Sequence, residues 1–271
     1  MPELPEVETT CRGVRPLLTG HTLTGVRVRC ARLRWPVDPE LASRLTGVRV
    51  TAVSRRAKYL LMALDSGATL IIHLGMSGSL RHVLADTPPE RHDHVDLLLG
   101  EHCLRYRDPR RFGAILYCPG PPELHPLLVK LGPEPLSDGF DGEVLFAACR
   151  GKTAAIKTVL MDNHVVVGVG NIYANEALFT AGVRPTRPAG QVSRDACQRL
   201  AAAIRATLLR AIEAGGSTLR DFTDAIGKPG YFQQQYAVYG RAGQPCHACA
   251  TLVQHTRLGQ RSSFFCPHCQ T

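Results

Sequence analysis

Apolar side chains recur at helical spacing near the start of the chain, where Val7, Cys11, Val14 and Leu18 fall on one face. This pattern predicts an amphipathic helix over residues 3–18. Proline is well tolerated at a helix start, so Pro2 is expected at the exposed beginning of this helix. Pro16 is expected to end or bend its last turn, because a proline inside a helix removes one backbone hydrogen bond.

Between His21 and Cys118 the pattern changes to short β-rich runs. Turn residues separate these runs, for example Asp65-Ser66-Gly67 and Thr87-Pro88-Pro89. The predicted strands cover residues 26–30, 48–50, 59–62, 70–72, 95–99 and 114–117. Several short strands at this spacing favour a β-sandwich or a barrel.

The segment 131–139 is rich in Gly and Pro and makes the best domain boundary. Helical patterns follow at residues 143–150, 153–162, 172–181 and 193–214, the last with Ser193 as N-cap and Gly215-Gly216 as its end. A long polar loop is expected at 217–231. The whole chain is therefore predicted to be an α+β protein, with an N-terminal β-sandwich domain (1–132), a helical domain (133–238) and a C-terminal ribbon (239–271).

Four cysteines form two pairs near the C-terminus, Cys246-x-x-Cys249 and Cys266-x-x-Cys269, with sixteen residues between the pairs. This spacing is typical of a zinc ribbon, in which four thiolates close a tetrahedral shell around one structural Zn²⁺. The alternative is a pair of redox dithiols. The remaining six cysteines of the ten are scattered singly, which is typical of reduced thiols in a cytosolic protein.

The charge balance predicts a polyanionic partner. The chain has 32 Lys and Arg against 23 Asp and Glu, a formal net charge of +9, which favours nucleic acid. No basic leader precedes an apolar run, and no apolar stretch approaches the length needed to cross a bilayer. We therefore expect a cytoplasmic protein without a membrane segment.

The first six residues, Met1-Pro2-Glu3-Leu4-Pro5-Glu6, contain a candidate nucleophile. Removal of Met1 would leave Pro2 with a free secondary amine. An α-amino group titrates near about pH 8, so part of it is neutral and nucleophilic at neutral pH. Attack on a sugar carbon would give a cationic iminium, and a neighbouring carboxyl of Glu3 or Glu6 could donate a proton. The alternative is that the prolines merely start a helix.

Three further motifs carry candidate chemistry, each with a structural alternative. Residues 108–113 (DPRRFG) and 73–78 (HLGMSG) combine arginines with apolar side chains. The structural alternative for them is a charged loop with a buried methionine. The basic run 55–60 lies at a strand start, where such runs are usually solvated edges. Residues 167–173 form a glycine-containing turn before a helix, but Tyr173 replaces the third glycine of a dinucleotide-binding motif. The alternative for this turn is contact with a DNA phosphate at a helix N-terminus.

The run Pro2-Glu3-Leu4-Pro5-Glu6-Val7-Glu8-Thr9-Thr10 closely resembles the N-terminus of the bacterial formamidopyrimidine-DNA glycosylases. The other motifs and the cysteine pairs occur in that family's order along the whole chain. The resemblance implies that Pro2, Glu3, Lys58 and Arg261 are catalytic. It also implies DNA contacts by Glu6, His73, Met76, Arg110, Phe112, Lys157, Asn171, Ser217, Thr218, Tyr239 and Arg261. In these contacts Met76 and Phe112 would be wedges inserted into the DNA duplex, and Arg110 would contact the unpaired cytosine.

The function that this resemblance implies is a bifunctional DNA glycosylase and AP lyase for oxidised purines, acting as a monomer on double-stranded DNA with oxidised bases or abasic sites. Two alternatives stay open. One is an endonuclease VIII-like glycosylase for oxidised pyrimidines, and the other is a non-catalytic zinc-ribbon protein that binds DNA. A metal at His92, His94 and Asp96 is not expected, because the family uses none there.

Overall fold

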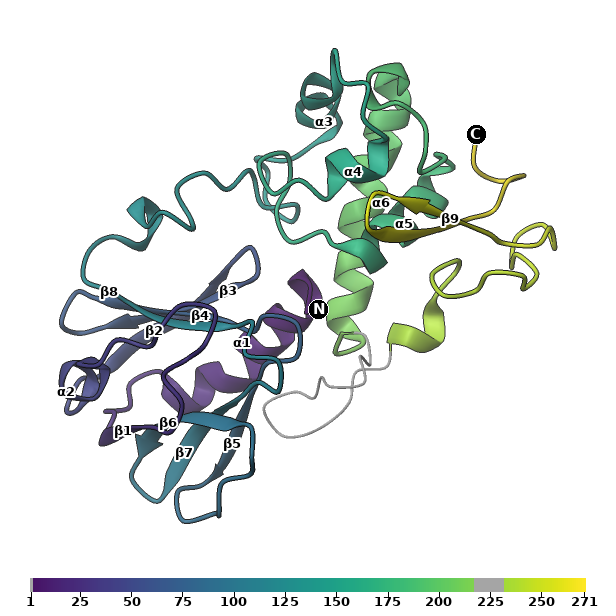
Figure 1. Cartoon of the computed structure of the whole chain (residues 1–271). Coiled ribbons are helices and arrows are strands. Elements are labelled where there is room, and N and C mark those ends of the chain that lie inside the picture. The colour runs from purple at the N-terminus through teal and green to yellow at the C-terminus, as the bar shows by residue number, and fades with distance from the viewer. Residues whose placement is uncertain (1, 217–231) are drawn as a thin grey trace. The chain divides into compact units, whose positions relative to one another are not determined.

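We analysed a computed structural model of the chain, which describes residues 2–216 and 232–271. The chain divides into two compact units (Figure 1). Among the described residues, the first unit contains residues 2–129 and 214–216, and the second contains 130–213 and 232–271. None of the helices in these described ranges has the length and apolar character that a membrane crossing requires.

The first helix, α1 (Leu4–Leu18), begins with a capping box. The Glu3 carboxylate accepts the backbone N–H of Glu6, and Glu6 Oε2 accepts the backbone N–H of Glu3 at 2.7 Å. These two bonds satisfy amides that a helix start leaves unpaired. Pro16 lies inside the helix without ending it, and Pro2 is buried, so its predicted exposure is wrong. The buried apolar face of the helix outweighs the hydrogen bond lost at Pro16.

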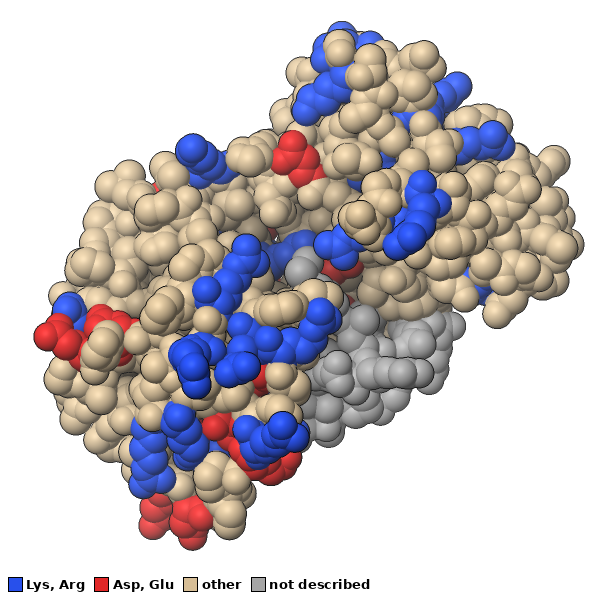
Figure 2. Space-filling view, viewed as in Figure 1, with Lys and Arg blue, Asp and Glu red and all other residues tan. Residues whose placement is uncertain are grey.

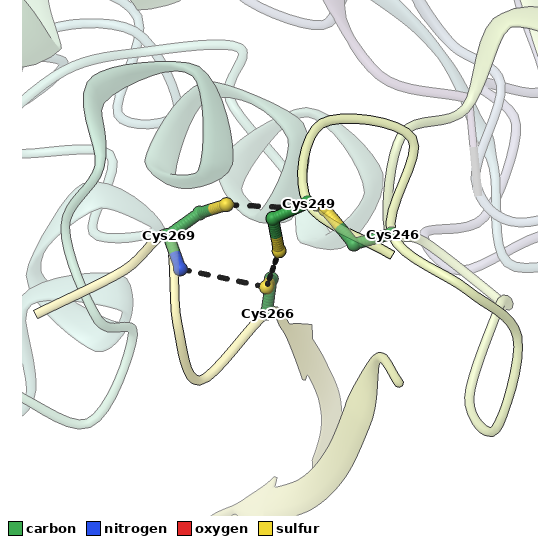
Figure 3. Close-up of side chains that lie close together, drawn as sticks. All are labelled: Cys246, Cys249, Cys266 and Cys269. Atoms are coloured by element: carbon green, nitrogen blue, oxygen red, sulfur yellow. Dashed lines mark hydrogen bonds between the residues drawn. The ribbon is translucent and has the colours of Figure 1, made fainter. Parts of the chain in front are cut away.

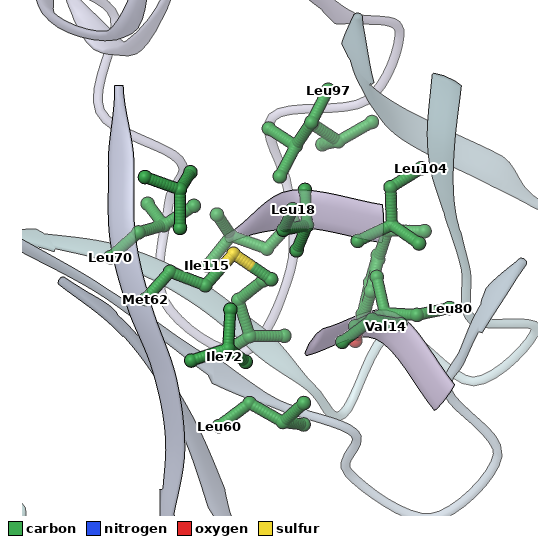
Figure 4. Close-up of a cluster of buried hydrophobic side chains, with 14 of the residues drawn as sticks. Val14, Leu18, Leu60, Met62, Leu70, Ile72, Leu80, Leu97, Leu104 and Ile115 are labelled. Carbon is green, nitrogen blue, oxygen red and sulfur yellow. The ribbon is translucent and has the colours of Figure 1, made fainter. Parts of the chain in front are cut away.

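Two antiparallel four-stranded sheets form the body of the first unit, in the strand orders β1-β6-β7-β5 and β2-β3-β4-β8. Helix α1 packs on both, and its residues Val14 and Leu18 lie among apolar side chains from the strands (Figure 4). The β-sandwich is therefore confirmed. The strands are β1 (Gly25–Val28), β2 (Val50–Arg56), β3 (Tyr59–Leu64), β4 (Thr69–His73), β5 (Ser79–Leu84), β6 (Asp93–Leu99), β7 (His102–Arg107) and β8 (Ala114–Cys118), with the short helix α2 (Leu41–Leu45) between β1 and β2.

Strands β5 and β7 and helix α2 are absent from the sequence prediction. Charged residues on both strands hide the apolar alternation. Arg105 on β7 is 1% exposed, and its Nε donates to Asp96 Oδ1 at 2.9 Å, while Arg81 on β5 donates to Asp93 at 2.8 Å. Ion pairs of this kind let arginines occupy interior positions that a hydrophobic pattern assigns to the surface.

The second unit contains four α-helices, and its last and longest one is α6. Ser193 caps α6, since its Oγ accepts the N–H of Ala196 at 3.2 Å, as predicted. Helix α4 is shorter than the predicted 153–162, because the chain turns into its N-terminus only at Ala155. The elements are η1 (Pro122–Leu124) before this unit, then α3 (Gly142–Cys149), α4 (Ile156–Leu160), α5 (Asn171–Ala181), η2 (Ala189–Gln191), α6 (Arg194–Glu213) and η3 (Phe232–Gln235).

A two-stranded ribbon completes the second unit. Strands β9 (Gln254–Leu258) and β10 (Arg261–Phe265) pair in antiparallel register, with Arg261 opposite Leu258. The turn between the two strands is only Gly259-Gln260. Arg261 therefore lies at the first strand position after the turn.

Candidate functional site

The start of α1 holds the candidate nucleophile and two carboxylates close together in sequence and space. Pro2 directly precedes the capping box, and Glu3 and Glu6 are 3% and 0% exposed. Gly216 also lies here, because a Cβ on it would meet Glu6 Cγ at 3.2 Å. The arrangement places two ordered carboxyl groups beside the residue that would carry a free amine.

Lys58 is the second residue of a two-residue turn between β2 and β3, and the strand pair Arg56–Tyr59 flanks this turn. Ala57, the first residue of the turn, has a left-handed φ of 53°. Arg55 ties this turn to α1: its Nη1 donates to Ala57 O at 2.9 Å, and its Nε donates to Glu8 at 2.9 Å. Lys58 is thereby held in place relative to the helix that carries Pro2.

Glu8 is the acidic partner in this link. Burial alone raises the pKa of its carboxyl, but hydrogen bonds from Arg12 and Arg55 outweigh that effect and hold its pKa below the usual value. The ion pair between Glu8 and Arg55 therefore stays formed at neutral pH.

His73, at the end of β4, is a neutral ring with a defined tautomer. Desolvation, with the positive charges of Lys58 and Arg34, lowers its pKa to about 4. Its Nδ1 accepts the backbone N–H of Gly75 at 3.1 Å. The proton of the neutral ring must then lie on Nε2, which is the nitrogen available to donate to a phosphate oxygen.

The loops 73–78 and 108–113 pack backbone to backbone, and glycines make this approach possible. A Cβ on Gly75 would lie 2.4 Å from Gly113 N, and a Cβ on Gly113 would lie 2.4 Å from His73 O and 1.8 Å from Tyr106 Oη. Any larger side chain would push the two loops apart. Met76 and Phe112 therefore lie on two loops whose spacing is fixed by their main chains.

Asp108 is the hydrogen-bond hub of these loops and is fully buried. Its Oδ1 accepts the Ser77 hydroxyl at 2.8 Å, and its Oδ2 accepts Gly113 N–H at 2.8 Å. Longer bonds come from Tyr106 Oη to Oδ2 at 3.3 Å and from Arg110 N to Oδ1 at 3.3 Å. One carboxylate thus shapes both loops.

The exposed end of the second loop combines charge with an aromatic ring. The Arg110 guanidinium lies 4.8 Å over the Phe112 ring, which is 45% exposed. Both line a cavity of about 630 Å³ with Leu33 and the arginines Arg32, Arg34 and Arg111. Lys and Arg side chains gather on the visible face of the first unit (Figure 2). A cavity with four guanidinium groups suits a polyanion.

The neighbouring run His92–Asp96 is occupied by other contacts. The Asp93 and Asp96 carboxylates pair with arginines, including Arg81 and Arg105. His94 Nε2 lies 2.8 Å from Asp108 O. These groups stabilise the sheet and the loop hub, and they do not converge as metal ligands.

In the second unit, α5 organises the candidate phosphate contacts. Asn171 is its first residue, after the N-cap Gly170, and its Oδ1 has no hydrogen-bond partner within residues 2–216 and 232–271. Glu176, one turn later, accepts three backbone amides: Ala237 at 2.7 Å, Val238 at 3.0 Å and Tyr239 at 2.8 Å. Burial raises the pKa of Glu176, and the three amide donors oppose that rise. Tyr239 is thereby anchored to α5.

The same helix also holds the ribbon. Asn175 Oδ1 accepts Phe264 N–H at 2.8 Å, and its Nδ2 donates to Asn171 O at 2.6 Å. The Phe264 ring contacts Tyr239 edge-on, with ring centroids 5.2 Å apart. Arg261 is exposed at the start of β10, whereas Lys157 is 1% exposed in α4 and bonded to β10. Ser217 and Thr218 lie outside the described residues.

The four cysteines of the two C-terminal pairs converge as the sequence predicts (Figure 3). All four Sγ atoms lie within 4.8 Å of one another, with Cys246 and Cys269 at 4.0 Å and Cys249 and Cys266 at 3.4 Å. A tetrahedral shell with Zn–S bonds of about 2.3 Å requires sulfur separations of about 3.8 Å. The donor set therefore fits one Zn²⁺ with all four positions filled by protein, which is a structural site.

Sequence models of three domains match the chain in order. They describe the formamidopyrimidine-DNA glycosylase N-terminal domain at residues 1–115, the H2TH domain of the same enzyme at 131–223, and a zinc finger found in FPG and IleRS at 243–271. The chain belongs to the formamidopyrimidine-DNA glycosylase family. The predicted family, fold class and zinc ribbon are confirmed.

Relatives in this family align over the full length of the chain. The formamidopyrimidine-DNA glycosylases of Laribacter hongkongensis and Methylococcus capsulatus are 61% and 56% identical over 271 residues, covering 100% of each chain. The Fpg crystal structure from Thermus thermophilus is 42% identical with a TM-score of 0.88, covering 99% of this chain and 98% of that one. A Lactococcus lactis Fpg complex with abasic-site DNA is 33% identical with a TM-score of 0.92, covering 99% of both.

Several residues that shape the site escaped the sequence analysis. Asp108 stood in a quoted motif without a role, and Glu176 and Asn175 were not singled out at all. The available signal was an acid or amide on the predicted helix 172–181 that interrupts its apolar face. Such a residue must find polar partners when it is buried.

Proposed function

We propose that this chain is a DNA glycosylase of base excision repair that removes oxidised purines and then cuts the strand as an AP lyase. The observation that carries the proposal is the start of α1. Pro2 precedes two buried, mutually capped carboxylates, in a chain that aligns end to end with formamidopyrimidine-DNA glycosylases.

The chemistry begins once Met1 is removed and Pro2 has a free amine. The Pro2 nitrogen attacks C1′ of the damaged nucleotide, the bond from C1′ to the base breaks, and the base departs with a proton. Glu3 donates a proton to the ring oxygen as the sugar opens, which leaves a cationic iminium between Pro2 and C1′. Glu6, bonded to the Glu3 amide, lies nearer the flipped base.

Strand cutting follows from the iminium. The positive charge acidifies the C2′ proton, so its removal expels the 3′ phosphate in a β-elimination. A δ-elimination then expels the 5′ phosphate and leaves a one-nucleotide gap. Lys58 and Arg261 are the cations that we assign to these phosphates, because a cation stabilises the charge that develops on a leaving phosphate.

DNA binding uses both units in this proposal. His73, Asn171, Tyr239 and Arg261 contact phosphates, together with the loop residues Ser217 and Thr218 near the lesion. Met76 and Phe112 fill the space of the flipped nucleotide, and Arg110 binds the unpaired cytosine. We propose the functional divisions 1–132, 133–238 and 239–271, and a monomer that works on DNA in the cytoplasm.

Borohydride trapping tests the proposal. The Met1-processed protein is incubated with a duplex containing 8-oxoguanine opposite cytosine, and borohydride reduces the iminium to a stable covalent adduct. We expect a covalent protein–DNA band that disappears when Pro2 is acetylated and weakens strongly in Pro2→Gly. Absence of the band in the processed wild type, with tight DNA binding retained, would contradict the enzyme assignment.

A parallel duplex with thymine glycol separates the substrate classes. Preference for 8-oxoguanine supports the proposal. Clear preference for thymine glycol would instead indicate the endonuclease VIII-like activity.

A further inference from the structure

The Lys157 side chain is buried against strand β10 and does not face solvent. It is 1% exposed, and its Nζ donates to Ser262 O at 2.6 Å and to Ser263 Oγ at 2.7 Å. Ser263 is itself fully buried. A buried ammonium is costly unless it is well bonded, so these two contacts are strong determinants of where β10 lies.

These two serines directly follow Arg261 in β10. The Asn175 side chain in α5 also bonds to this strand, where its Oδ1 accepts Phe264 N–H. Towards the turn, the packing opens. A cavity of about 210 Å³ is lined by Lys157, Thr158 and Met161 from the α4 segment and by residues 258–261 of the hairpin.

Because of this cavity, the turn does not pack tightly on α4, and the position of Arg261 depends on anchors farther along β10. Lys157 is the anchor next to Arg261 in the strand, one and two residues away. Asn175 is three residues away. A substitution of Lys157 would therefore affect the Arg261 backbone more directly than a substitution of Asn175.

We propose that Lys157 is a positioning residue for Arg261, and that it contributes to DNA binding by fixing β10 and not by a phosphate contact of its own. The inference rests on the proposed function, in which Arg261 binds a phosphate. It replaces the direct DNA contact that the family resemblance implies for Lys157.

The test measures affinity for a duplex with a tetrahydrofuran abasic analogue over a series of salt concentrations. The informative variant is Ser263→Ala, which removes one acceptor of Lys157 and keeps its charge. We expect it to weaken binding about tenfold, the size of one lost charge-assisted hydrogen bond, and Lys157→Met to weaken it similarly. Ser262→Ala is the matched control, because Ser262 accepts through its backbone oxygen, and it should bind as the wild type does.

Double variants with Arg261→Gln decide between the two roles. If Lys157 acts through Arg261, neither Lys157→Met nor Ser263→Ala weakens binding further in the Arg261→Gln background. A direct phosphate contact predicts the opposite. Lys157→Met would then lower the salt slope by about 0.9 even in that background, and Ser263→Ala would have no effect. That result would overturn the inference.

Zinc stoichiometry separates misplacement from unfolding. Ser263→Ala should retain one Zn²⁺ per chain. If it retains zinc and binds like the wild type, the inference is wrong. Failure of the proposed function gives a different outcome, namely a processed wild type that forms no trapped adduct with an 8-oxoguanine duplex.

Discussion

Asp108 offers a quantitative test of how the loops 73–78 and 108–113 are held together. Its carboxylate accepts two bonds of 2.8 Å, from Ser77 Oγ and Gly113 N, and two of 3.3 Å, from Tyr106 Oη and Arg110 N. Asp108→Ala removes all four acceptor contacts and leaves a buried amide without a partner. Two good bonds to a charged group are worth about 1.5–3 kcal/mol each, so we expect a loss of about 3–6 kcal/mol.

Asp108→Asn is the matched variant. Its one remaining oxygen can accept from Gly113 N–H, and its amide group can donate to the Ser77 hydroxyl, so every close contact keeps a partner. The charge assistance and the long bond from Arg110 N–H at 3.3 Å are lost, while that N–H keeps Ser77 Oγ at 3.2 Å as an acceptor, and we expect about 1 kcal/mol. The contrast between the two variants thus separates the need for an acceptor from the need for a charge.

Urea denaturation followed by tryptophan fluorescence measures both values. Trp35 is the only tryptophan in the chain, and the guanidinium of Arg34 stacks on its ring at 4.8 Å. The backbone N–H of Arg34 donates to Gly113 O at 3.1 Å. The signal therefore reports on the first unit beside the loops. With a urea slope of about 2 kcal/mol/M, Asp108→Ala should lower the midpoint by about 2 M and Asp108→Asn by about 0.5 M. Equal midpoints for wild type and Asp108→Ala would refute the hub.

Three further outcomes are expected. The His73 ring should titrate near pH 4 by NMR. Because its folded pKa is depressed, its contribution to stability should be complete above about pH 6.5 and be lost as the pH falls through about 4. A titration midpoint near pH 6.5 would contradict the buried neutral ring. Gly113→Ala should lower the melting temperature and the rate of 8-oxoguanine excision. Gly120→Ala, whose added Cβ would meet nothing within 4 Å, should change neither; equal behaviour of the two variants would show that the loops are not in close contact. Cys249→Ser should lose zinc and melt at lower temperature by calorimetry, whereas Cys30→Ser should keep one Zn²⁺ per chain; full zinc binding by the former would exclude the four-thiolate site.

Local signals account for the parts of the structure that the sequence predicted well. The cysteine spacing is a short-range constraint, and the convergence of four thiolates follows from two tight turns and one hairpin. The amphipathic face of α1 and the cap at Ser193 likewise depend on neighbours in sequence. These features need no knowledge of the remainder of the fold.

Long-range polar contacts explain what the sequence did not predict. Strands β5 and β7 are hard to find because their arginines are neutralised by acids on β6. Burial of the Lys157 ammonium depends on Ser263, more than a hundred residues away. Pairings over such distances leave no periodic trace, so a basic residue in a basic chain is easily assigned to DNA.

The stacking of Arg110 on Phe112 has a consequence for the protein's behaviour when no DNA is bound. The role that we propose for Phe112 requires an exposed ring, and exposed apolar surface promotes self-association. The guanidinium over the ring keeps a positive charge on its face, with mutual repulsion between molecules that approach ring to ring. The stacked Arg110 guanidinium therefore opposes self-association through the exposed Phe112 ring.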